Sequence, residues 1–222
     1  MTTQTPSIGE QTHAFMAGPG AAMPAEVMGT FVAEQVNLDD AGVPTGVSAP
    51  GALMPDGELL DVRGAATSLA QVRAGRPAVV VFYRGAWCPY CNIALNAYQA
   101  ELLGELDRRS VTLVALSPQT PDGSLSMQEK NDLGFAVLSD PGNSLARSVG
   151  ILTAPSQEAR AAQLQLGLDL EIVNADGTTA IPMPTVLILT PDLTVRWVDV
   201  HPDYTTRSEP AEILAALDAI TR

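Results

Sequence analysis

The chain has 222 residues, of which 46% are hydrophobic, enough for one domain with a substantial core and too many for a wholly disordered protein. Its 25 acidic and 12 basic residues give a formal net charge of -13, which would repel nucleic acid phosphates and anionic lipid surfaces. Neither nucleic acid nor a membrane is therefore expected as a partner. The longest strongly apolar run, residues 78–83, is far shorter than the roughly 20 residues of a bilayer span, and no basic stretch followed by an apolar one opens the chain. A cytoplasmic location is expected.

The first part of the chain differs from the rest in charge, because eight acidic residues but no Lys or Arg precede Arg63. Residues 1–20 are rich in Thr, Gln, Gly and Pro without an apolar period, which predicts a mobile arm. Apolar residues at helical spacing predict a helix over residues 24–36. The predicted organisation is an N-terminal arm and helix at residues 1–48 and a main domain at residues 49–222. The arm is predicted to join two copies in a homodimer or to act as a lid.

The main domain alternates between strand and helix patterns. A hairpin is predicted from residues 52–54 and 58–62 around Pro55-Asp56-Gly57, followed by a short helix at 68–73. The later elements are strands at 78–84, 111–117 and 135–138, helices at 89–108, 124–133, 143–149 and 157–166, a hairpin of 185–189 with 194–200, and a helix at 209–220. This alternation predicts an α/β fold with a helix-covered sheet.

The two cysteines of the chain, Cys88 and Cys91, stand one helical turn apart after the buried strand at 78–84. In a reducing compartment such a C-x-x-C pair favours catalysis or metal binding over a structural disulfide. If Cys88 is the N-cap, Pro89 occupies the first helical position, which suits its fixed φ. The unpaired N–H groups and the positive helix end would then lower the pKa of Cys88, so helix physics predicts Cys88 as the reactive thiol.

Cys91 falls on the apolar stripe of the same helix, with Leu95, Tyr98, Leu102 and Leu106. Its sulfur is therefore expected to point inward and to act as the resolving thiol. The alternatives are two inert core cysteines or a zinc site. Zinc usually needs four ligands, and only His13 and His201 could complete the set, so no metal is expected.

Three segments resemble the peroxiredoxin-like branch of the alkyl hydroperoxide reductase and thiol-specific antioxidant family. They are Phe82-Tyr83-Arg84-Gly85-Ala86-Trp87-Cys88-Pro89-Tyr90-Cys91-Asn92, Ile181-Pro182-Met183-Pro184-Thr185 and Asp203-Tyr204-Thr205-Thr206-Arg207-Ser208-Glu209-Pro210. The resemblance runs from about residue 51 to the end of the chain. It implies a thioredoxin-like fold, in which helices flank a central mixed β-sheet, with a helical extension before it here.

The resemblance names a different nucleophile from helix physics. Peroxiredoxins carry Pro-x-x-x-Thr-x-x-Cys, which places Arg84 at the family's Pro, Cys88 at its Thr and Cys91 at its peroxide-attacking Cys. In that interpretation Cys91 becomes a sulfenic acid and Cys88 condenses with it to a disulfide. The family also places an activating Arg near the later strand, where this chain has Met183-Pro184, a pattern typical of the thioredoxin cis-proline. Arg84 could supply a nearby positive charge.

Other residues near the motif are expected to contact the substrate. A cis bond before Pro184 would leave the backbone of Met183 to pair with an extended substrate. Trp87 is expected to shield the dithiol or to pack as an ordinary aromatic. Tyr83 and Arg84 should form the rim of the site. Outside this set, His201 is interpreted as a loop residue, and Tyr204 and Arg207 as a structural tie to the last helix or as substrate contacts.

Together these observations predict a thiol oxidoreductase with a Cys88/Cys91 couple that reduces hydroperoxides or disulfides. An external thiol would donate the electrons, and no cofactor is expected. A thioredoxin-like disulfide reductase with a narrow partner is one alternative. A redox sensor that is oxidised once without turnover is another.

Overall fold

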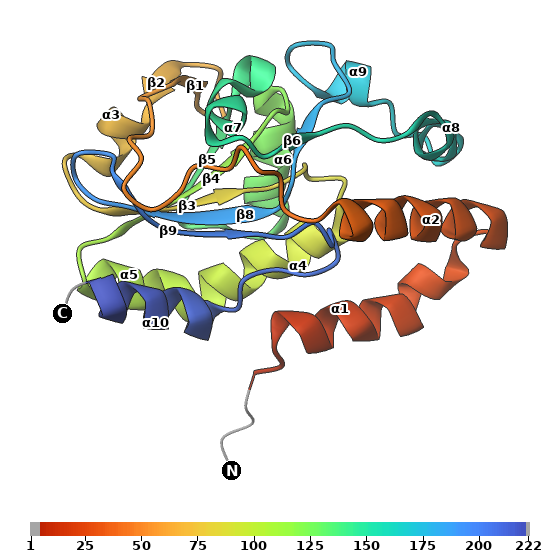
Figure 1. Ribbon diagram of the computed structural model, residues 1–222, viewed down its shortest axis with the longest axis horizontal. Helices are drawn as coiled ribbons and strands as arrows, with labels where there is room; N and C mark the ends of the chain where they lie inside the picture. The colour runs from red at the N-terminus through yellow and green to blue at the C-terminus, as the bar shows by residue number, and fades with distance from the viewer. Residues whose placement is uncertain (1–4, 221–222) are drawn as a thin grey trace.

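A seven-stranded mixed β-sheet forms the centre of the protein (Figure 1). The computed structural model describes residues 5–220. Across the sheet the strands follow the order β2 (Ala66–Ser68), β1 (Glu58–Leu60), β5 (Ala136–Ser139), β4 (Thr112–Ser117), β3 (Ala78–Phe82), β8 (Thr185–Leu189) and β9 (Val195–Val200). β3, β4 and β5 run parallel to one another, whereas β3 pairs antiparallel with β8 and β8 with β9. The predicted mixed sheet is confirmed.

Helices cover both faces of this sheet (Figure 1). One face carries α4 (Pro89–Ala97), the π-helical turn η2 (Tyr98–Leu102), α5 (Leu103–Arg108) and α10 (Pro210–Ile220), and the other carries α3 (Leu69–Arg73) and α7 (Ser144–Val149). α6 (Pro121–Lys130) packs against β5, and the short η3 (Pro141–Asn143) leads into α7. α8 (Gln157–Gln165) and α9 (Leu170–Val173) lie to one side, near the antiparallel pair β6 (Leu152–Thr153) and β7 (Ile181–Pro182).

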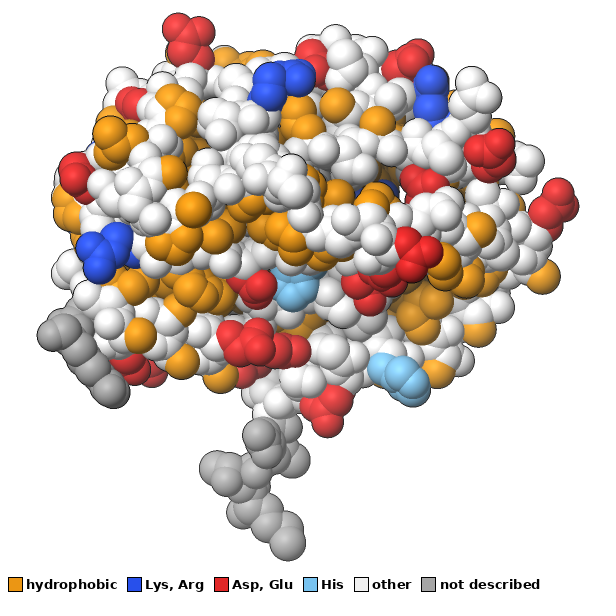
Figure 2. All heavy atoms as spheres, viewed as in Figure 1, with side chains coloured by type: hydrophobic (Ala, Val, Ile, Leu, Met, Phe, Trp, Pro, Cys, Tyr) orange, Lys and Arg blue, Asp and Glu red, His pale blue; other side chains and the backbone are white. Residues whose placement is uncertain are grey.

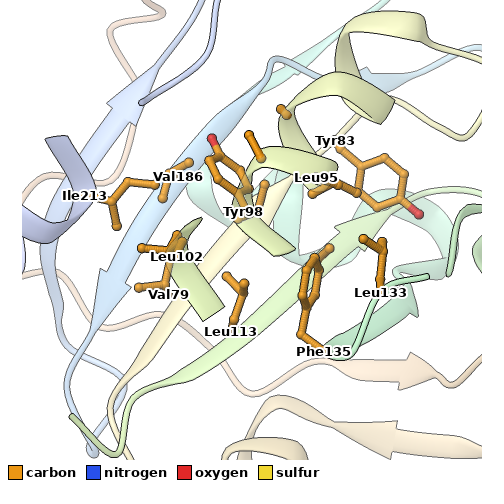
Figure 3. Close-up of a cluster of buried hydrophobic side chains, with 14 of the residues drawn as sticks. Val79, Tyr83, Leu95, Tyr98, Leu102, Leu113, Leu133, Phe135, Val186 and Ile213 are labelled. Atoms are coloured by element: carbon orange, nitrogen blue, oxygen red, sulfur yellow. The ribbon is translucent and has the colours of Figure 1, made fainter. Parts of the chain in front are cut away.

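β3 is buried at every position because it lies inside the sheet between two helical layers. Val79 and Val81 contribute to the core beneath α4, and Ala78, Val80 and Phe82 to the core on the opposite face. The stripe predicted along the thiol helix is confirmed, since its five side chains, Cys91, Leu95, Tyr98, Leu102 and Leu106, have no exposed surface. Figure 3 shows Leu95, Tyr98 and Leu102 pointing into this core. Burial on this scale fixes the start of α4 against the sheet.

The prediction of a mobile arm over residues 1–20 is wrong for residues 8–17, which form helix α1 (Ile8–Ala17). Ser7 and Glu10 make a reciprocal capping box at its start, and Ile8 is 1% exposed. Residues 1–4 lie outside the described part of the chain. The 3-10 turn η1 (Pro19–Ala22) then leads to α2 (Ala25–Ala41), which is longer than the predicted helix. α1 packs on α4 and α2 on α8.

The predicted hairpin around Pro55-Asp56-Gly57 is also wrong, because β1 pairs instead with β2 beyond it. The turn lies at residues 61–65, where the Asp61 carboxylate accepts the backbone N–H groups of Arg63 and Ala65, each at 2.8 Å. Gly64 adopts the positive φ of 80° that this turn requires. The later strands and helices lie where the sequence predicts them, with ends shifted by a few residues, whereas α9, β6 and β7 were not predicted.

On the visible face acidic side chains are more frequent than Lys or Arg, and hydrophobic side chains are exposed over much of it (Figure 2). Hydrophobic atoms are exposed between the positions of α1 and α2 in the same view. Within residues 5–220, every helix is too short or too polar to cross a bilayer.

Candidate thiol active site

The two cysteines lie at the start of α4, as the sequence predicts. Cys88 is the N-cap with extended backbone angles, and Pro89 is the first helical residue. The loop before them is held tightly, because the Cys88 N–H donates to the Gly85 carbonyl at 3.1 Å and the Asn92 side chain donates to the Cys88 carbonyl at 2.8 Å. Cys88 is 1% exposed and Cys91 is fully buried, and both are free thiols.

Arg207 approaches both sulfurs from the segment between β9 and α10. Its Nη2 atom lies 3.0 Å from the Sγ of Cys91 and 3.9 Å from the Sγ of Cys88. The guanidinium is buried, and its Nη1 atom donates to the carbonyls of Tyr204 and Thr206. A buried cation held by backbone carbonyls favours a thiolate at the nearer sulfur, which is Cys91.

The pKa values of the two thiols are shifted in opposite directions. Burial raises the pKa of Cys88 well above its ordinary value, and the neighbouring Cys91 adds to that shift. Burial also acts to raise the pKa of Cys91, but the hydrogen bond from the Cys88 thiol, the charge of Arg207 and a backbone hydrogen bond from Arg84 together bring it well below the ordinary value. These opposite shifts favour a thiolate at Cys91 and a thiol at Cys88.

This arrangement reverses the assignment made from helix physics, which gave the lower pKa to Cys88. Cys88 does occupy the N-cap of α4, as predicted. It is almost completely desolvated, however, and Arg207 is nearer to Cys91. A direct hydrogen bond to a buried cation outweighs the partial charge of a helix end, which is worth roughly 0.3–1 kcal/mol. The interpretation drawn from the peroxiredoxin motif, with Cys91 as the activated thiol, agrees with these contacts.

A polar cluster around His201 holds the Arg207 segment in place. The His201 ring nitrogens lie 3.0 Å from a carboxylate oxygen of Asp199 and 2.7 Å from the Thr206 hydroxyl. The Ser208 hydroxyl donates to the same Asp199 oxygen at 2.7 Å, and the Tyr98 hydroxyl donates to the Ser208 carbonyl. Both neighbours of Arg207 are thus anchored. The sequence interpretation treated His201 as a loop residue and Arg207 as a structural tie or a substrate contact, and it did not place Arg207 beside the thiols.

Arg84 and Trp87 lie in the loop between β3 and α4, directly before the two cysteines. The Arg84 guanidinium carbon lies 5.1 Å from the centre of the Trp87 ring and 4.3 Å from that of Tyr204, so aromatic faces hold the cation. The Trp87 ring also covers Gly85, where an added Cβ would lie 2.3 Å from its indole nitrogen. The charge of Arg84 also acts to lower the pKa of Cys88, but more weakly than burial raises it.

Tyr83 does not form the rim predicted for it. Its side chain is 1% exposed and belongs to the core shown in Figure 3, because Tyr83 directly follows β3 and faces the same helical layer as Val81. Burial raises the pKa of its hydroxyl. The predicted rim position of Tyr83 is therefore wrong, whereas Arg84 does lie at the rim.

The predicted cis bond at Met183-Pro184 is wrong as well, since this bond is trans. The backbone of Met183 is already used, because its N–H donates to the Ile151 carbonyl at 2.8 Å and its carbonyl accepts the Thr185 hydroxyl at 2.9 Å. Met183 and Pro184 line a small cavity of about 20 Å³ beside Arg84, which neither cysteine lines. This region therefore offers no free strand edge for a substrate.

A larger cavity lies against the thiol site and is mainly apolar. We call it the apolar chamber; it has a volume of about 620 Å³, within the range of small-molecule sites. Its walls come from α1, η1, α2 and the segment between α8 and α9, together with Arg84, Trp87, Cys88, Tyr90 and Tyr204. Cys88 lines it and Cys91 does not.

The mixed sheet and the thiol pair at the start of α4 place the chain in the thioredoxin superfamily. Its residues 50–198 match the model of the AhpC/TSA family, so the chain belongs to that family. Two candidate peroxiredoxins of Mycobacterium tuberculosis strains are each 33% identical to it over 92 residues. This alignment spans 41% of the chain and 57% of the length of each relative.

Solved structures of peroxiredoxins share the fold. Peroxidoxin BcpB from Mycobacterium tuberculosis has a TM-score of 0.59 at 20% identity, covering 77% of this chain and 97% of its own. Reduced Prx3 from Vibrio vulnificus in complex with hydrogen peroxide has a TM-score of 0.62 at 18% identity, covering 77% and 99%. The family match runs from residue 50 to residue 198. α1 and α2 lie before it, and Arg207 lies after it.

Proposed function

We propose that this protein is a thiol-dependent peroxidase in which Cys91 attacks the peroxide and Cys88 resolves the product. The observation that carries the proposal is the position of the buried Arg207 guanidinium, 3.0 Å from the sulfur of Cys91 and 3.9 Å from that of Cys88. Family membership supports peroxide as the substrate. A thiolate is the form of cysteine that attacks peroxides, and Arg207 stabilises it where it is formed.

The cycle has three steps. The Cys91 thiolate attacks one oxygen of a hydroperoxide ROOH, the O–O bond breaks, and the products are Cys91 sulfenic acid and, after proton uptake, the alcohol ROH. The Cys88 thiol then attacks the Cys91 sulfur, forming the disulfide and releasing water. Two equivalents of an external thiol reduce the disulfide and leave as their own disulfide. Both sulfurs lie within 4 Å of one nitrogen of Arg207, which favours the second step without a large rearrangement.

The remaining assignments belong to this proposal. Residues 49–222 are assigned as the catalytic domain and residues 1–48 as the N-terminal arm and helix, of which α1 and α2 line the apolar chamber. Arg84 and Trp87 line the route to the sulfurs, and a reducing compartment such as the cytoplasm would return the pair to thiols between turnovers. A homodimer joined through the N-terminal segment is compatible with its helical structure.

Serine variants of the two cysteines test the assignment. We expect a sulfenic acid probe to label the Cys88→Ser protein after one equivalent of hydrogen peroxide, because Cys91 is oxidised and cannot be resolved. The Cys91→Ser protein should remain unlabelled under the same conditions. Labelling of the Cys91→Ser protein alone would contradict the proposal and favour Cys88 as the nucleophile.

The second candidate function is disulfide reduction started by Cys88. Its support is that Cys88 lies on the wall of the apolar chamber, where a disulfide could reach it. Against it stands the raised pKa of that thiol, which leaves little thiolate at neutral pH. Steady-state turnover separates the functions: a peroxidase consumes hydroperoxide continuously in the presence of a thiol donor, a disulfide reductase does not, and a redox sensor stops after one equivalent.

A further inference from the structure

The apolar chamber meets only one sulfur of the pair, and that sulfur has a defined task in the proposed cycle. Cys88 lines the chamber, whereas Cys91 lies behind it against Arg207. Once the disulfide has formed, a donor thiolate must attack one of its sulfurs in line with the S–S bond. Attack on Cys88 expels Cys91, which is the better leaving group because Arg207 lowers its pKa. A thiol that attacks Cys88 would have to reach this sulfur from the chamber.

The charge of the chamber wall favours an incoming thiolate. Arg84 is its only charged lining residue among those described, and it borders Cys88. A cation beside the attacked sulfur favours an incoming thiolate, whereas it gives little advantage to an uncharged hydroperoxide.

The remaining walls fit an apolar body attached to that thiolate. Phe15 and Met16 of α1 and Met28, Phe31, Val32 and Val36 of α2 line the chamber. Two hydroxyl groups at the thiol end are already engaged, since Tyr90 donates to the Met16 sulfur and Tyr204 to the Phe31 carbonyl. Few polar groups are therefore free to hold a hydrophilic thiol, and burial of carbon chains becomes the main source of affinity.

We propose, on the basis of the peroxidase cycle above, that the apolar chamber binds the electron donor and that this donor is a small thiol with an apolar body. Its thiolate attacks Cys88, breaks the S–S bond and releases Cys91 as a thiolate. A second thiol attacks the donor sulfur of this mixed disulfide, releases Cys88 and leaves with the first donor as a disulfide. Two thiols are oxidised and one protein disulfide is reduced, so electrons balance.

Two probe thiols that differ only in chain length test this proposal. N-acetylcysteamine and N-octanoylcysteamine share the same reacting end and differ by six methylene groups. Each buried methylene favours binding about fourfold, so burial of only two of them gives a difference of about sixteenfold. The protein is first oxidised to the disulfide with diamide, and its reduction is followed in single turnover by thiol titration.

We expect the second-order rate constant to be at least tenfold larger for the octanoyl thiol. The Val36→Asp variant should bring the ratio of the two rate constants close to one, because it places a carboxylate on the apolar wall. Val43→Asp is the matched control: both side chains are 52% exposed, but Val43 does not line the chamber. The control should retain the ratio, and the charge effect on the thiolate cancels because both probes carry the same charge.

Equal rate constants for the two probes, or an unchanged ratio in Val36→Asp, would overturn the proposal. Faster reduction by a thioredoxin-type protein than by the octanoyl thiol would also overturn it, because such a donor would have to reach Cys88 by another route. If Val36→Asp instead slows oxidation of the reduced protein by cumene hydroperoxide and leaves the ratio unchanged, the chamber is the peroxide route. Because diamide forms the disulfide without peroxide, these results are independent of the peroxidase test.

Discussion

Replacement of Arg207 by Gln is the sharpest test of how the thiolate is stabilised. The Arg207 guanidinium is buried and donates to the Cys91 sulfur at 3.0 Å. A hydrogen bond to a charged partner contributes about 1.5–3 kcal/mol, and Gln can keep the packing but not the charge. Since about 1.4 kcal/mol corresponds to a factor of ten, we expect oxidation of Cys91 by hydrogen peroxide to slow by about tenfold to 150-fold at neutral pH.

The pH profile of the oxidation rate, measured by stopped-flow fluorescence, distinguishes this electrostatic effect from misfolding. In the native protein the pKa of Cys91 is lowered, so the rate should be flat through neutral pH. In Arg207→Gln the pKa rises, so the rate should increase with pH over that range and approach the native value in alkali. Arg207→Lys retains a positive charge, so its oxidation rate at neutral pH should fall less than that of Arg207→Gln. A native rate and a flat profile in Arg207→Gln would refute the argument.

Three further predictions concern the attachment of α1 and the stability of the domain. Glu209→Gln removes the carboxylate that accepts the first two N–H groups of α1, each at 2.9 Å, so hydrogen exchange in residues 8–17 should quicken by an amount corresponding to about 1 kcal/mol, and unchanged exchange would contradict this. Asp140→Ala leaves the start of α7 without its buried cap and should lower the free energy of unfolding by about 2–4 kcal/mol in urea titration; a loss below 1 kcal/mol would show that the cap matters little. Gly150→Ala should lower the free energy of unfolding by about 1–3 kcal/mol in the same assay, because the position has a φ of 81° and the new Cβ would lie 2.3 Å from the Gly46 carbonyl oxygen. An unchanged free energy of unfolding would show that the chain accommodates the Cβ without strain.

Much of the domain could be predicted from the sequence because its signals are local. The residues of β3 form an unbroken apolar run, and Pro89 after Cys88 marks a helix start. The inward stripe of α4 follows directly from helical spacing. α1 was missed although Ser7 and Glu10 form a capping box, because its Thr and Gln content obscured the apolar pattern. A further cap comes from Glu209, whose carboxylate accepts the N–H of Gly9 from 200 residues later in the chain.

The identity of the activated thiol could not be derived from local helix physics. That argument considered only the end of α4, whereas the decisive charge comes from Arg207, 116 residues after Cys91. One signal was available, since Arg207 lies in the third segment that resembles the family. Its contact with the thiols depends on how the segment after β9 folds back over α4, which no sequence pattern specifies. The prediction of a cis bond at Pro184 likewise rested on a local pattern, which gave no sign of the contacts of the neighbouring backbone with β6 and Ile151.

The segment from His201 to Glu209 connects the thiol chemistry to the N-terminal helices. Tyr204 donates its backbone N–H to the Gln35 side chain and its hydroxyl to the Phe31 carbonyl, both in α2, while Glu209 caps α1. Between these anchors Arg207 reaches Cys91. Movement of α1 and α2 away from the domain would break contacts on both sides of Arg207 and loosen the cation that sets the thiolate. The part of the chain that matches the family model contains both sulfurs but neither Arg207 nor the two helices, so in the proposed cycle the reactivity of this pair depends on elements outside the matched region.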